Sequence, residues 1–413
     1  MMKNTLRFGW RFAAVAAVVL ALLCAHPAGT PVQALGETSI VAIDWSPDGN
    51  YIARVLGSDT VEVLDLASGA TVFTSSQHQT PVRWASVKWH PTDDTRLAAG
   101  LGSLLYIWDI ATEESIVLQA GSPDGIADTE AGEMPEAILS IDWNPSGDHL
   151  AACSIGGFLR TWTQSGEEWV LDLDMFVRQI SSVAWSPDSE LLYVGASVAL
   201  VKVNPTSGEM QRLGERSLTP GVVTSIDLSP DGQKLVSGTV FGQVLVWDAT
   251  DGDRIYFIEN LPQDAIQEVR WNPDGSRFAS AGPGGTVRVW DAATGEEVSV
   301  YQSSERIFSV AWSPDGEQLA YSGESGTLEI VTPGSFALYA TRTAPDGIQV
   351  PEIARLSPPM PGQVLAAAWN PGRTAVLVAA QDGAARRLWL VRTDGAAQDI
   401  TPAAGAPDLA GWR

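Results

Sequence analysis

Histidine and cysteine offer the widest range of chemistry in this sequence, and both are scarce. Of 4 histidines and 2 cysteines, His78, His90, His149 and Cys153 lie beyond the first 34 residues. A zinc site needs several such ligands at short spacings, and none of these residues is spaced that way from another. Cys153 lies in an apolar run typical of a buried strand, where a thiol is inert. We therefore predict no metal site and no cysteine nucleophile.

The motifs of other catalytic classes are also missing. Gly195–Ala199 is similar to a nucleophile elbow, but the elbow needs a strand-to-helix turn, and the flanking pattern here predicts a hairpin. The sequence contains no phosphate-binding loop and no dinucleotide fingerprint. The acidic run Asp248–Asp253 lacks the spacing and the closing Glu of a calcium loop. We predict no catalytic residue, no cofactor and no enzymatic activity.

Carboxylates recur mainly in one local motif, Trp-Ser-Pro-Asp-Gly and its variants. Proline presets φ, aspartate hydrogen-bonds its own backbone and glycine accepts a positive φ, so the motif predicts a tight turn. The motif places these aspartates at the turns: Asp48, Asp188, Asp231, Asp274 and Asp315. We expect them to cap turns rather than to bind a ligand.

The turn belongs to a longer repeat that occurs eight times. Each copy has an apolar anchor residue just before the turn, and the anchors are Trp45, Trp89, Trp143, Trp185, Leu228, Trp271, Trp312 and Trp369. Their spacings are 44, 54, 42, 43, 43, 41 and 57 residues. Repeats of this length indicate propellers or solenoids.

The elements that carry these residues are short strands. Within each copy, apolar and polar residues alternate in four runs that are separated by turn residues, which predicts a four-stranded antiparallel sheet. Such a sheet buries both faces only when copies stack around an axis, with the anchor rings between neighbours. We predict an all-β fold, a β-propeller of about eight four-stranded blades, with seven blades as the alternative. The copies begin near residues 38, 82, 136, 178, 221, 264, 305 and 362.

The residue before each anchor has the same register in every copy, so these residues should lie at one level around the central channel. The charged members of this set are Asp44, Lys88, Asp142, Asp227 and Arg270. We expect mutually compensating charges in contact with water. The alternative is a polar ligand or an ion held in the channel mouth.

Three Trp-Asp dipeptides at the ends of predicted third strands, Trp108-Asp109, Trp247-Asp248 and Trp290-Asp291, resemble the WD-repeat family. The resemblance covers about residues 37–402. It implies a propeller that binds proteins rather than a catalyst. No copy has the Gly-His dipeptide of that family, and only Asp59 and Asp382 match the Asp between the second and third strands. The His–Asp–Ser–Trp hydrogen-bond network of the family is therefore not expected.

Two further resemblances define alternatives. The last copy, which contains Arg387–Val391, looks like the periplasmic Tol-associated propellers. The segment Trp290–Gly295 is similar to a repeat of quinone-cofactor dehydrogenases, but the docking Trp of those repeats is missing from Val298–Tyr301. A cofactor- or ion-binding propeller enzyme is the alternative to a protein-binding scaffold.

In the WD-repeat family, the loops before first strands and between second and third strands lie on one face. Here those loops offer aromatic and arginine side chains, which are favoured at interaction hot spots. The candidate partner-binding residues are Arg83, Trp84, Phe158, Phe176, Arg178, Phe241, Arg306 and Phe308. We predict a non-catalytic scaffold that binds a protein partner and is itself a monomer.

Residues 1–34 have the pattern of a secretory signal peptide. Lys3, Arg7 and Arg11 precede the apolar run 12–23, and small residues at Val32-Gln33-Ala34 suit cleavage. A retained membrane anchor is the alternative, and Cys24 gives a weak lipoprotein site. We expect an exported protein with no membrane span after cleavage, followed by a propeller at 37–402 and a tail at 403–413.

The formal charge of −24 disfavours phosphate backbones, so we predict no nucleic-acid partner. Two insertions interrupt the repeat. Residues 111–136 are acidic with no Lys or Arg, and residues 332–363 include the Pro-rich run 357–362. Long loops bind partners or are disordered, and for the acidic insertion we expect disorder.

Overall fold

The computed structural model describes residues 38–75, 84–129, 132–197, 199–213, 221–258, 265–336, 339–343, 349–355, 360–361, 363–369, 375–382, 385–392 and 397–399. The chain divides into two compact units, residues 1–330 and residues 331–413. The predicted signal peptide and the predicted C-terminal tail lie outside the described residues. Among the described residues, no helix has the length and apolar character needed to cross a membrane.

The first unit is a ring of antiparallel sheets, each of which is one blade. Blade 1 contains β1 (Ile40–Trp45), β2 (Tyr51–Leu56), β3 (Val61–Asp65) and β4 (Thr71–Thr74). Blade 2 contains β5 (Ser86–His90), β6 (Asp93–Leu101), β7 (Leu104–Asp109) and β8 (Glu114–Gln119). Blade 3 contains β11 (Ile138–Trp143), β12 (His149–Ser154), β13 (Phe158–Ser165) and β14 (Glu168–Phe176). Blade 4 contains β15 (Ile180–Trp185), β16 (Leu192–Ala196), β17 (Ala199–Val203) and β18 (Met210–Leu213).

The remaining blades of the ring follow the same order. Blade 5 contains β19 (Val223–Leu228), β20 (Lys234–Thr239), β21 (Val244–Asp248) and β22 (Arg254–Ile258). Blade 6 contains β23 (Glu268–Trp271), β24 (Arg277–Ala281), β25 (Thr286–Asp291) and β26 (Glu297–Gln302). Blade 7 contains β27 (Ile307–Trp312), β28 (Leu319–Gly323) and β29 (Leu328–Val331).

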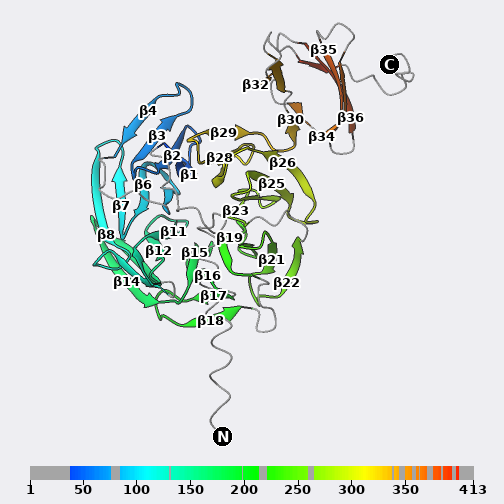
Figure 1. Ribbon diagram of the computed structural model, residues 1–413. Coiled ribbons are helices and arrows are strands. Elements are labelled where there is room, and N and C mark those ends of the chain that lie inside the picture. The colour runs from blue at the N-terminus through cyan, green and yellow to red at the C-terminus, as the bar shows by residue number, and fades with distance from the viewer. Residues whose placement is uncertain are drawn as a thin grey trace. The chain divides into compact units, whose positions relative to one another are not determined.

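The ring has seven blades, so the all-β prediction is confirmed and the count of eight is wrong (Figure 1). Each first strand packs against the first strands of its two neighbours, and β27 packs directly against β1. The Trp45 indole N–H donates to the carbonyl of Ala311 at 3.1 Å, and the Ile43 N–H donates to Ser309 Oγ at 3.2 Å. Blade 7 therefore occupies the position that an eighth blade would need, because the inter-blade contacts are already complete.

The eighth copy forms a separate sheet in the second unit. Its strands are β34 (Gln363–Trp369), β35 (Ala375–Asp382), β36 (Ala385–Arg392) and β37 (Ala397–Asp399). The same unit contains two antiparallel strand pairs, β30 (Ser335–Phe336) with β33 (Met360–Pro361) and β31 (Tyr339–Thr343) with β32 (Gln349–Arg355). Copy eight thus has the four-stranded order of a blade without being part of the ring.

The repeat turns form as their residue types dictate. Ser313 Oγ donates to Asp315 Oδ1 at 2.5 Å, and the Glu317 N–H donates to the same oxygen at 3.0 Å. These hydrogen bonds lower the pKa of Asp315 below its ordinary value. Gly316, at the end of this turn, has a φ of 72°. Asp48, Asp188 and Asp231 make the equivalent Ser–Asp bonds, and Asp274 accepts from the Ser276 N–H at 2.7 Å. The prediction that these aspartates cap turns is confirmed.

The anchor residues lie between blades, as predicted. Trp45 packs with Ile43 and Ile52 of its own blade and with Ala311 and Ala320 of blade 7. Three further anchors donate their indole N–H to the preceding blade, namely Trp143 to Lys88 O, Trp271 to Asp227 O and Trp312 to Arg270 O. The Trp89, Trp185 and Leu228 side chains are also buried, whereas Trp369 belongs to the second unit.

One link of the His–Asp–Ser–Trp hydrogen-bond network is present, although we expected none of it. The Trp247 indole N–H donates to Ser237 Oγ and the Trp290 indole N–H donates to Ser280 Oγ, both at 2.9 Å. These bonds are the Ser–Trp link of the network that we did not expect. The link needs only a Ser on the second strand and a Trp on the third strand, so it forms without the missing His.

The acidic insertion is ordered where it is described, and the expectation of disorder is wrong there. It contains the fourth strand of blade 2 and a hairpin of β9 (Ile126–Thr129) and β10 (Gly132–Pro135). The buried Glu136 carboxylate accepts from the N–H groups of Ser122 at 2.9 Å and Gly156 at 3.0 Å. A buried carboxylate needs such donors, and here they fix the base of the insertion.

Candidate functional site: the mouth of the central channel

The first strands of the blades begin with a backbone irregularity that shapes the channel mouth. In β1, β11, β15, β19 and β27 the pairing register shifts at the second residue of the strand, as between Ile138 and Ser140. A bulge of this kind re-aims the side chains next to it. The residues just beyond it form one level around the axis, which we call the serine level: Ala42, Ser86, Ser140, Ser182, Ser225, Glu268 and Ser309.

The serine level joins neighbouring blades through hydrogen bonds to backbone N–H groups. Each serine oxygen accepts from the next blade, in the pairs Ser86 with Ile141, Ser140 with Val183, Ser182 with Ile226, Ser225 with Val269 and Ser309 with Ile43, at 3.2–3.3 Å. Glu268 replaces a serine in blade 6, and its Oε2 accepts from the Val310 N–H at 2.8 Å. Six of the seven blade junctions therefore share one type of contact, and Ala42 leaves the seventh without it.

The charged residues predicted for the channel lie two residues further along the same strands. Asp44, Asp142 and Asp227 each accept through Oδ2 from the backbone N–H of the next blade's anchor position, at 2.8, 2.8 and 2.6 Å. Lys88 Nζ lies 3.5 Å from Asp44 Oδ1, and Arg270 forms an ion pair with Glu268. These charged residues, which we call the charged level, thus neutralise part of one another's charge, and they also connect neighbouring blades.

The channel environment shifts the pKa values of Asp142, Asp227 and Arg270. Burial raises the pKa of Asp142 to about 6, although Lys88 and the Trp185 N–H act in the opposite direction. Burial also raises the pKa of Asp227. Burial alone would lower the pKa of Arg270, but Glu268 and the channel aspartates more than offset this effect and raise it. Arg270 interacts with aspartates of blades 1, 3 and 5, so these side chains converge on the axis.

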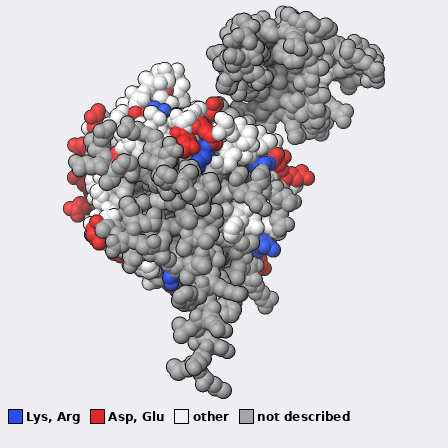
Figure 2. Space-filling view, in the orientation of Figure 1, with Lys and Arg blue, Asp and Glu red and all other residues white. Residues whose placement is uncertain are grey.

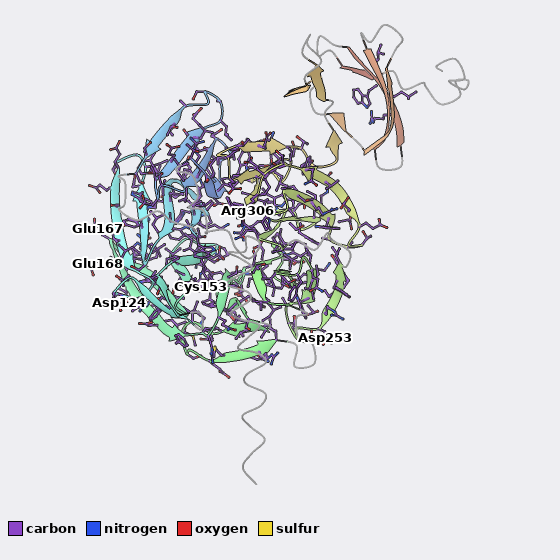
Figure 3. The ribbon with its side chains drawn as sticks, in the orientation of Figure 1. Asp124, Cys153, Glu167, Glu168, Asp253 and Arg306 are labelled. Carbon is purple, nitrogen blue, oxygen red and sulfur yellow. The ribbon has the colours of Figure 1, made fainter. Side chains whose placement is uncertain are left out.

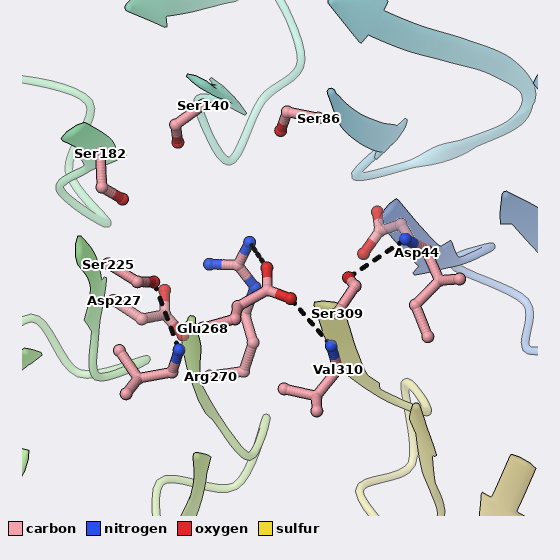
Figure 4. A network of polar contacts seen from close by, with 12 residues as sticks. Asp44, Ser86, Ser140, Ser182, Ser225, Asp227, Glu268, Arg270, Ser309 and Val310 are labelled. Carbon is pink, nitrogen blue, oxygen red and sulfur yellow. Dashed lines mark hydrogen bonds and ion pairs between the residues drawn. The ribbon is translucent and has the colours of Figure 1, made fainter. Parts of the chain in front are cut away.

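A pocket of about 110 Å³ opens above the serine level. Figure 4 shows the serines of five blades around the Glu268–Arg270 ion pair. The pocket rim is apolar where blades 7, 1, 2 and 3 contribute Phe308, Val41, Trp84 and Leu139. It is polar where blades 4, 5 and 6 contribute Ser181, Thr224 and Gln267. A volume of this size holds several waters or one side chain.

The polar half of the pocket has hydrogen-bonding capacity to spare. Among the described residues, the buried Thr224 Oγ1 has no hydrogen-bond partner. Buried hydroxyl groups in native proteins normally have one, and here a water or a group from a bound partner would supply it. The pocket therefore offers an apolar wall and one unsatisfied hydroxyl, that of Thr224, to the same entering group.

The predicted partner-binding residues fall into distinct environments. Trp84 and Phe308 line the pocket, and the Arg306 guanidinium lies 5.6 Å from the Phe308 ring centroid. Phe176 and Phe241 are 64% and 48% exposed.

These two exposed rings are held by glycines. A Cβ on Gly157 or Gly221 would come within 2.6 Å of Phe176 or Phe241, so each ring packs closely against its glycine. The Arg160 guanidinium covers Phe158 at 4.6 Å, Arg178 is exposed, and Arg83 lies outside the described residues.

Sequence reasoning missed the serine level and Glu268. The signal was available, because a Ser stands two residues before the charged position in most copies. We considered only charged residues as channel candidates, so a recurring neutral hydroxyl was not singled out.

The residues considered for catalysis or metal binding have structural roles. His90 accepts from the Thr92 N–H and contacts the Gly147 carbonyl at 3.1 Å, and burial lowers its pKa. Cys153 is fully buried, which raises the pKa of its thiol. Asp248 accepts from the Thr250 N–H at 2.7 Å in an ordinary turn. The part of the chain that the structure describes holds no cluster of three or more His, Cys, Asp or Glu fit for a metal.

Comparison with known proteins agrees with the ring. The family model "WD domain, G-beta repeat" matches residues 132–163, 215–248 and 295–330, and the model "Anaphase-promoting complex subunit 4 WD40 domain" matches residues 242–310.

Curated relatives match parts of the chain. Periodic tryptophan protein 2 of Arabidopsis thaliana is 23% identical over 52% of this chain and 23% of its own length. Protein transport protein SEC31 of Phaeosphaeria nodorum is 27% identical over 46% of this chain and 14% of its own. Cell division cycle 20.1, cofactor of APC complex, of Arabidopsis thaliana is 24% identical over 38% of this chain and 33% of its own. The chain thus matches a third or less of the length of these relatives.

A closed ring of seven blades around a small polar channel mouth defines a seven-bladed β-propeller. The repeat matches agree with this fold: residues 132–163 and 215–330 match models of the WD40-repeat family. Propellers of this family are typically protein-interaction scaffolds and are generally non-catalytic.

Proposed function

We propose that this chain is a non-catalytic scaffold that binds a protein partner across the mouth of its central channel. The observation that carries the proposal is the two-sided pocket, which is lined both by Trp84 and Phe308 and by Thr224 and Ser181. Aromatic residues beside desolvated polar groups are the usual composition of interaction hot spots. A single side chain of a partner fits a pocket of about 110 Å³.

The surface next to the pocket supports the same interpretation. Phe241 lies in the β20–β21 turn, whose Val240 N–H donates to Val222 O at 3.0 Å, and Val222 is two residues before the pocket residue Thr224. Phe176 ends β14 and packs on Gly157, four residues before the inner strand β15 begins. Both rings are therefore at the channel-mouth end of their blades, and both are exposed although burial would stabilise them.

The partner of this surface is a protein rather than a nucleic acid, because the chain carries a formal charge of −24. The relatives include proteins whose names refer to transport and to an APC cofactor. These names do not identify a partner for this chain. Export remains part of the proposal, and it is supported by the basic, apolar and small-residue order of residues 1–34.

Site-specific photo-crosslinking tests the binding face directly. A photo-reactive residue replaces Phe241 in one variant and Met210 in a control variant, since both side chains are about half exposed but Met210 lies on the outer strand β18. We expect a discrete crosslinked protein in the native host only from position 241. Equal crosslinking from both positions, or from Met210 alone, would contradict the proposal. Sequencing the amino terminus of the recovered protein tests cleavage after Ala34 in the same preparation.

A further inference from the structure

The outer strands of blades 2 and 3 form a second surface, which we call the blade 2–3 rim. It consists of β8 and β14 with the turns that precede them. The two strands lie side by side, because Leu118 of β8 and Trp169 of β14 pack against one cluster that contains Trp143 (Figure 1). Arg160 of β13 also donates to Gln119 O at 3.0 Å, which connects the two blades near the end of β8.

Both strands of the rim expose apolar side chains in consecutive pairs. Ile116 and Val117 of β8 are 40% and 48% exposed, and Val170 and Leu171 of β14 are both 48% exposed. Single exposed apolar residues are common on protein surfaces, but groups of them on neighbouring elements mark interaction sites. Because successive side chains of a strand point to opposite faces, each face of the rim exposes one apolar residue of each pair, and an added strand would cover part of both faces.

Acidic residues surround these apolar pairs. The exposed carboxylates are Glu113, Glu114, Glu167, Glu168 and Asp172. Neither β8 nor β14 contains a Lys or an Arg. Figure 2 shows acidic side chains along the edge of the ring where Figure 3 labels Glu167 and Glu168, with little basic surface among them.

The other outer strands differ in charge. β18 contains Arg212, and β22 begins with Arg254, whose guanidinium lies 4.9 Å from the Phe257 ring centroid. In β26, Glu297 forms an ion pair with Arg288 of the neighbouring strand. β4 and β26 also contain no Lys or Arg, and Asp174 of β14 forms an ion pair with Arg160 of β13, so the rim is distinguished by its five exposed carboxylates beside the exposed apolar pairs.

The rim also presents a free strand edge. β14 is the last strand in its sheet and has 9 residues, whereas the other fourth strands have 4 to 6. A register shift at Asp172 leaves Glu168–Leu171 as a regular segment that contains the exposed pair. No described strand pairs with the outer edge of β14. Unpaired N–H and C=O groups along an edge are a template for another strand.

We infer that the blade 2–3 rim binds an extended segment of a partner protein in which Lys or Arg alternates with apolar residues, and that this segment adds to β14 as a fifth strand. Main-chain pairing gives such complexes affinity, and side chains on alternate positions give them specificity. The carboxylates select basic residues, and the apolar pairs accept the residues between them. A second copy of this chain is disfavoured, because two surfaces of the same acidic charge repel each other.

This inference goes beyond the proposed function, because it concerns a different surface with a different type of partner. Binding at the rim uses no residue of the channel mouth. Loss of one activity with retention of the other distinguishes the two proposals experimentally.

Defined peptides test the inference with the full chain. The probe is a nine-residue peptide that alternates Lys and Val, and its comparison peptides replace Lys with Glu or carry methyl groups on the backbone amides. We expect the Lys peptide to bind and both comparison peptides to bind at least about tenfold more weakly, because one loses charge complementarity and the other loses strand pairing. Hydrogen exchange should slow at backbone amides of β14 and not at those of β26.

Charge-reversal variants test the position of the site. E167K/E168K should weaken binding of the Lys peptide by about tenfold, since two attractive charges become repulsive. E209K/E296K is the matched control, because it makes the same charge change at exposed positions near β18 and β26, and it should change binding by less than about twofold. No binding up to about 1 mM, equal binding of the methylated peptide, or equal effects of the two variants would overturn the inference.

Discussion

The carboxylate of Asp227 accepts a hydrogen bond from the backbone N–H of Trp271 in the next blade, with 2.6 Å between Oδ2 and N. The indole N–H of Trp271 also donates to the backbone carbonyl of Asp227 at 3.1 Å. One residue of blade 5 therefore contacts the anchor of blade 6 twice, through its side chain and its backbone. The charged level of the channel is thus part of the mechanical connection between blades, besides being a source of charge.

Removing the Asp227 carboxylate should destabilise the ring. Asp227→Ala leaves the Trp271 N–H without its acceptor, and a buried unsatisfied donor costs about 1–3 kcal/mol of unfolding free energy. Asp227→Asn keeps an acceptor oxygen and should cost less. Urea unfolding measures both variants, with Glu317→Gln as an exposed control expected to lie within about 0.5 kcal/mol of the wild type. An Asp227→Ala variant with the same unfolding free energy as the wild type would show that the contact adds nothing to stability.

The raised pKa of Asp142 predicts a specific dependence of stability on pH. Burial raises this pKa to about 6, above the value of about 4 in an unfolded chain, so the folded state binds the proton more tightly. The contribution of Asp142 to unfolding free energy therefore falls as pH rises from about 4 to about 6, and it stays at its lower value above that range. In D142N the uncharged amide can still accept from the Trp185 N–H.

Unfolding curves at several pH values measure this effect as a difference between two proteins. The stability of the wild type relative to D142N should decrease between pH 4 and pH 6 and should be constant above pH 7. Using the difference removes the opposite contribution of the turn aspartates, whose pKa values are lowered. A difference that is independent of pH would contradict the burial of the Asp142 charge.

Alanine variants of two glycines with similar backbone conformations distinguish the cost of backbone strain from the cost of steric overlap. Gly147 and Gly69 have φ values of 78° and 70°. A Cβ on Gly147 would lie 2.0 Å from His90 Nε2 of the neighbouring blade, whereas a Cβ on Gly69 would have no neighbour within 4 Å. Both alanine variants should lose about 1 kcal/mol through backbone strain, and Gly147→Ala should lose about 1–3 kcal/mol more through steric overlap. Thermal unfolding of the pair measures the difference, and equal losses would argue against the His90 contact.

The sequence predicted the blade but not the number of blades. Turns such as Ser313–Gly316 and anchors such as Trp312 are local features, and they specify the four-stranded unit wherever they occur. Ring closure depends on which copy meets β1, and this is a non-local choice. The eighth copy carries Trp369, yet Ala366 and Ala368 stand where other copies have the serine and the channel charge. It lacks the polar residues that connect blades in the ring.

The candidate site was predicted in part. A common register identified the five charged positions, because strand periodicity relates each of them to a visible anchor. The pocket itself depends on the bulge that re-aims Ser140 and on the rim of Trp84, Phe308 and Thr224. The bulge shifts the alternation of side chains by one residue at the start of the strand, so periodicity alone did not place the serines, although their recurrence two residues before the charged position was visible. Glu268 was missed because its register is that of a serine.

Closure by blade 7 predicts that the ring does not depend on the eighth copy. The closing contacts of Trp45 with Ala311, Ile43 with Ser309 and Ser39 with Glu324 all lie within residues 38–330. A chain that ends at Phe336 should keep the unfolding free energy of the ring within about 1 kcal/mol of its value in the full chain. Loss of cooperative unfolding in the shorter chain would mean that the eighth copy is needed for closure.

The central claim is that the channel mouth binds a protein partner, and the affinity of that partner for a double variant tests it most directly. Titration calorimetry compares the wild type with Trp84→Ala/Phe241→Ala, using the partner identified by crosslinking. Loss of two aromatic hot-spot residues should weaken binding by at least about 100-fold, while the unfolding midpoint of the variant should show that the ring is intact. Unchanged affinity in the folded double variant would contradict the account.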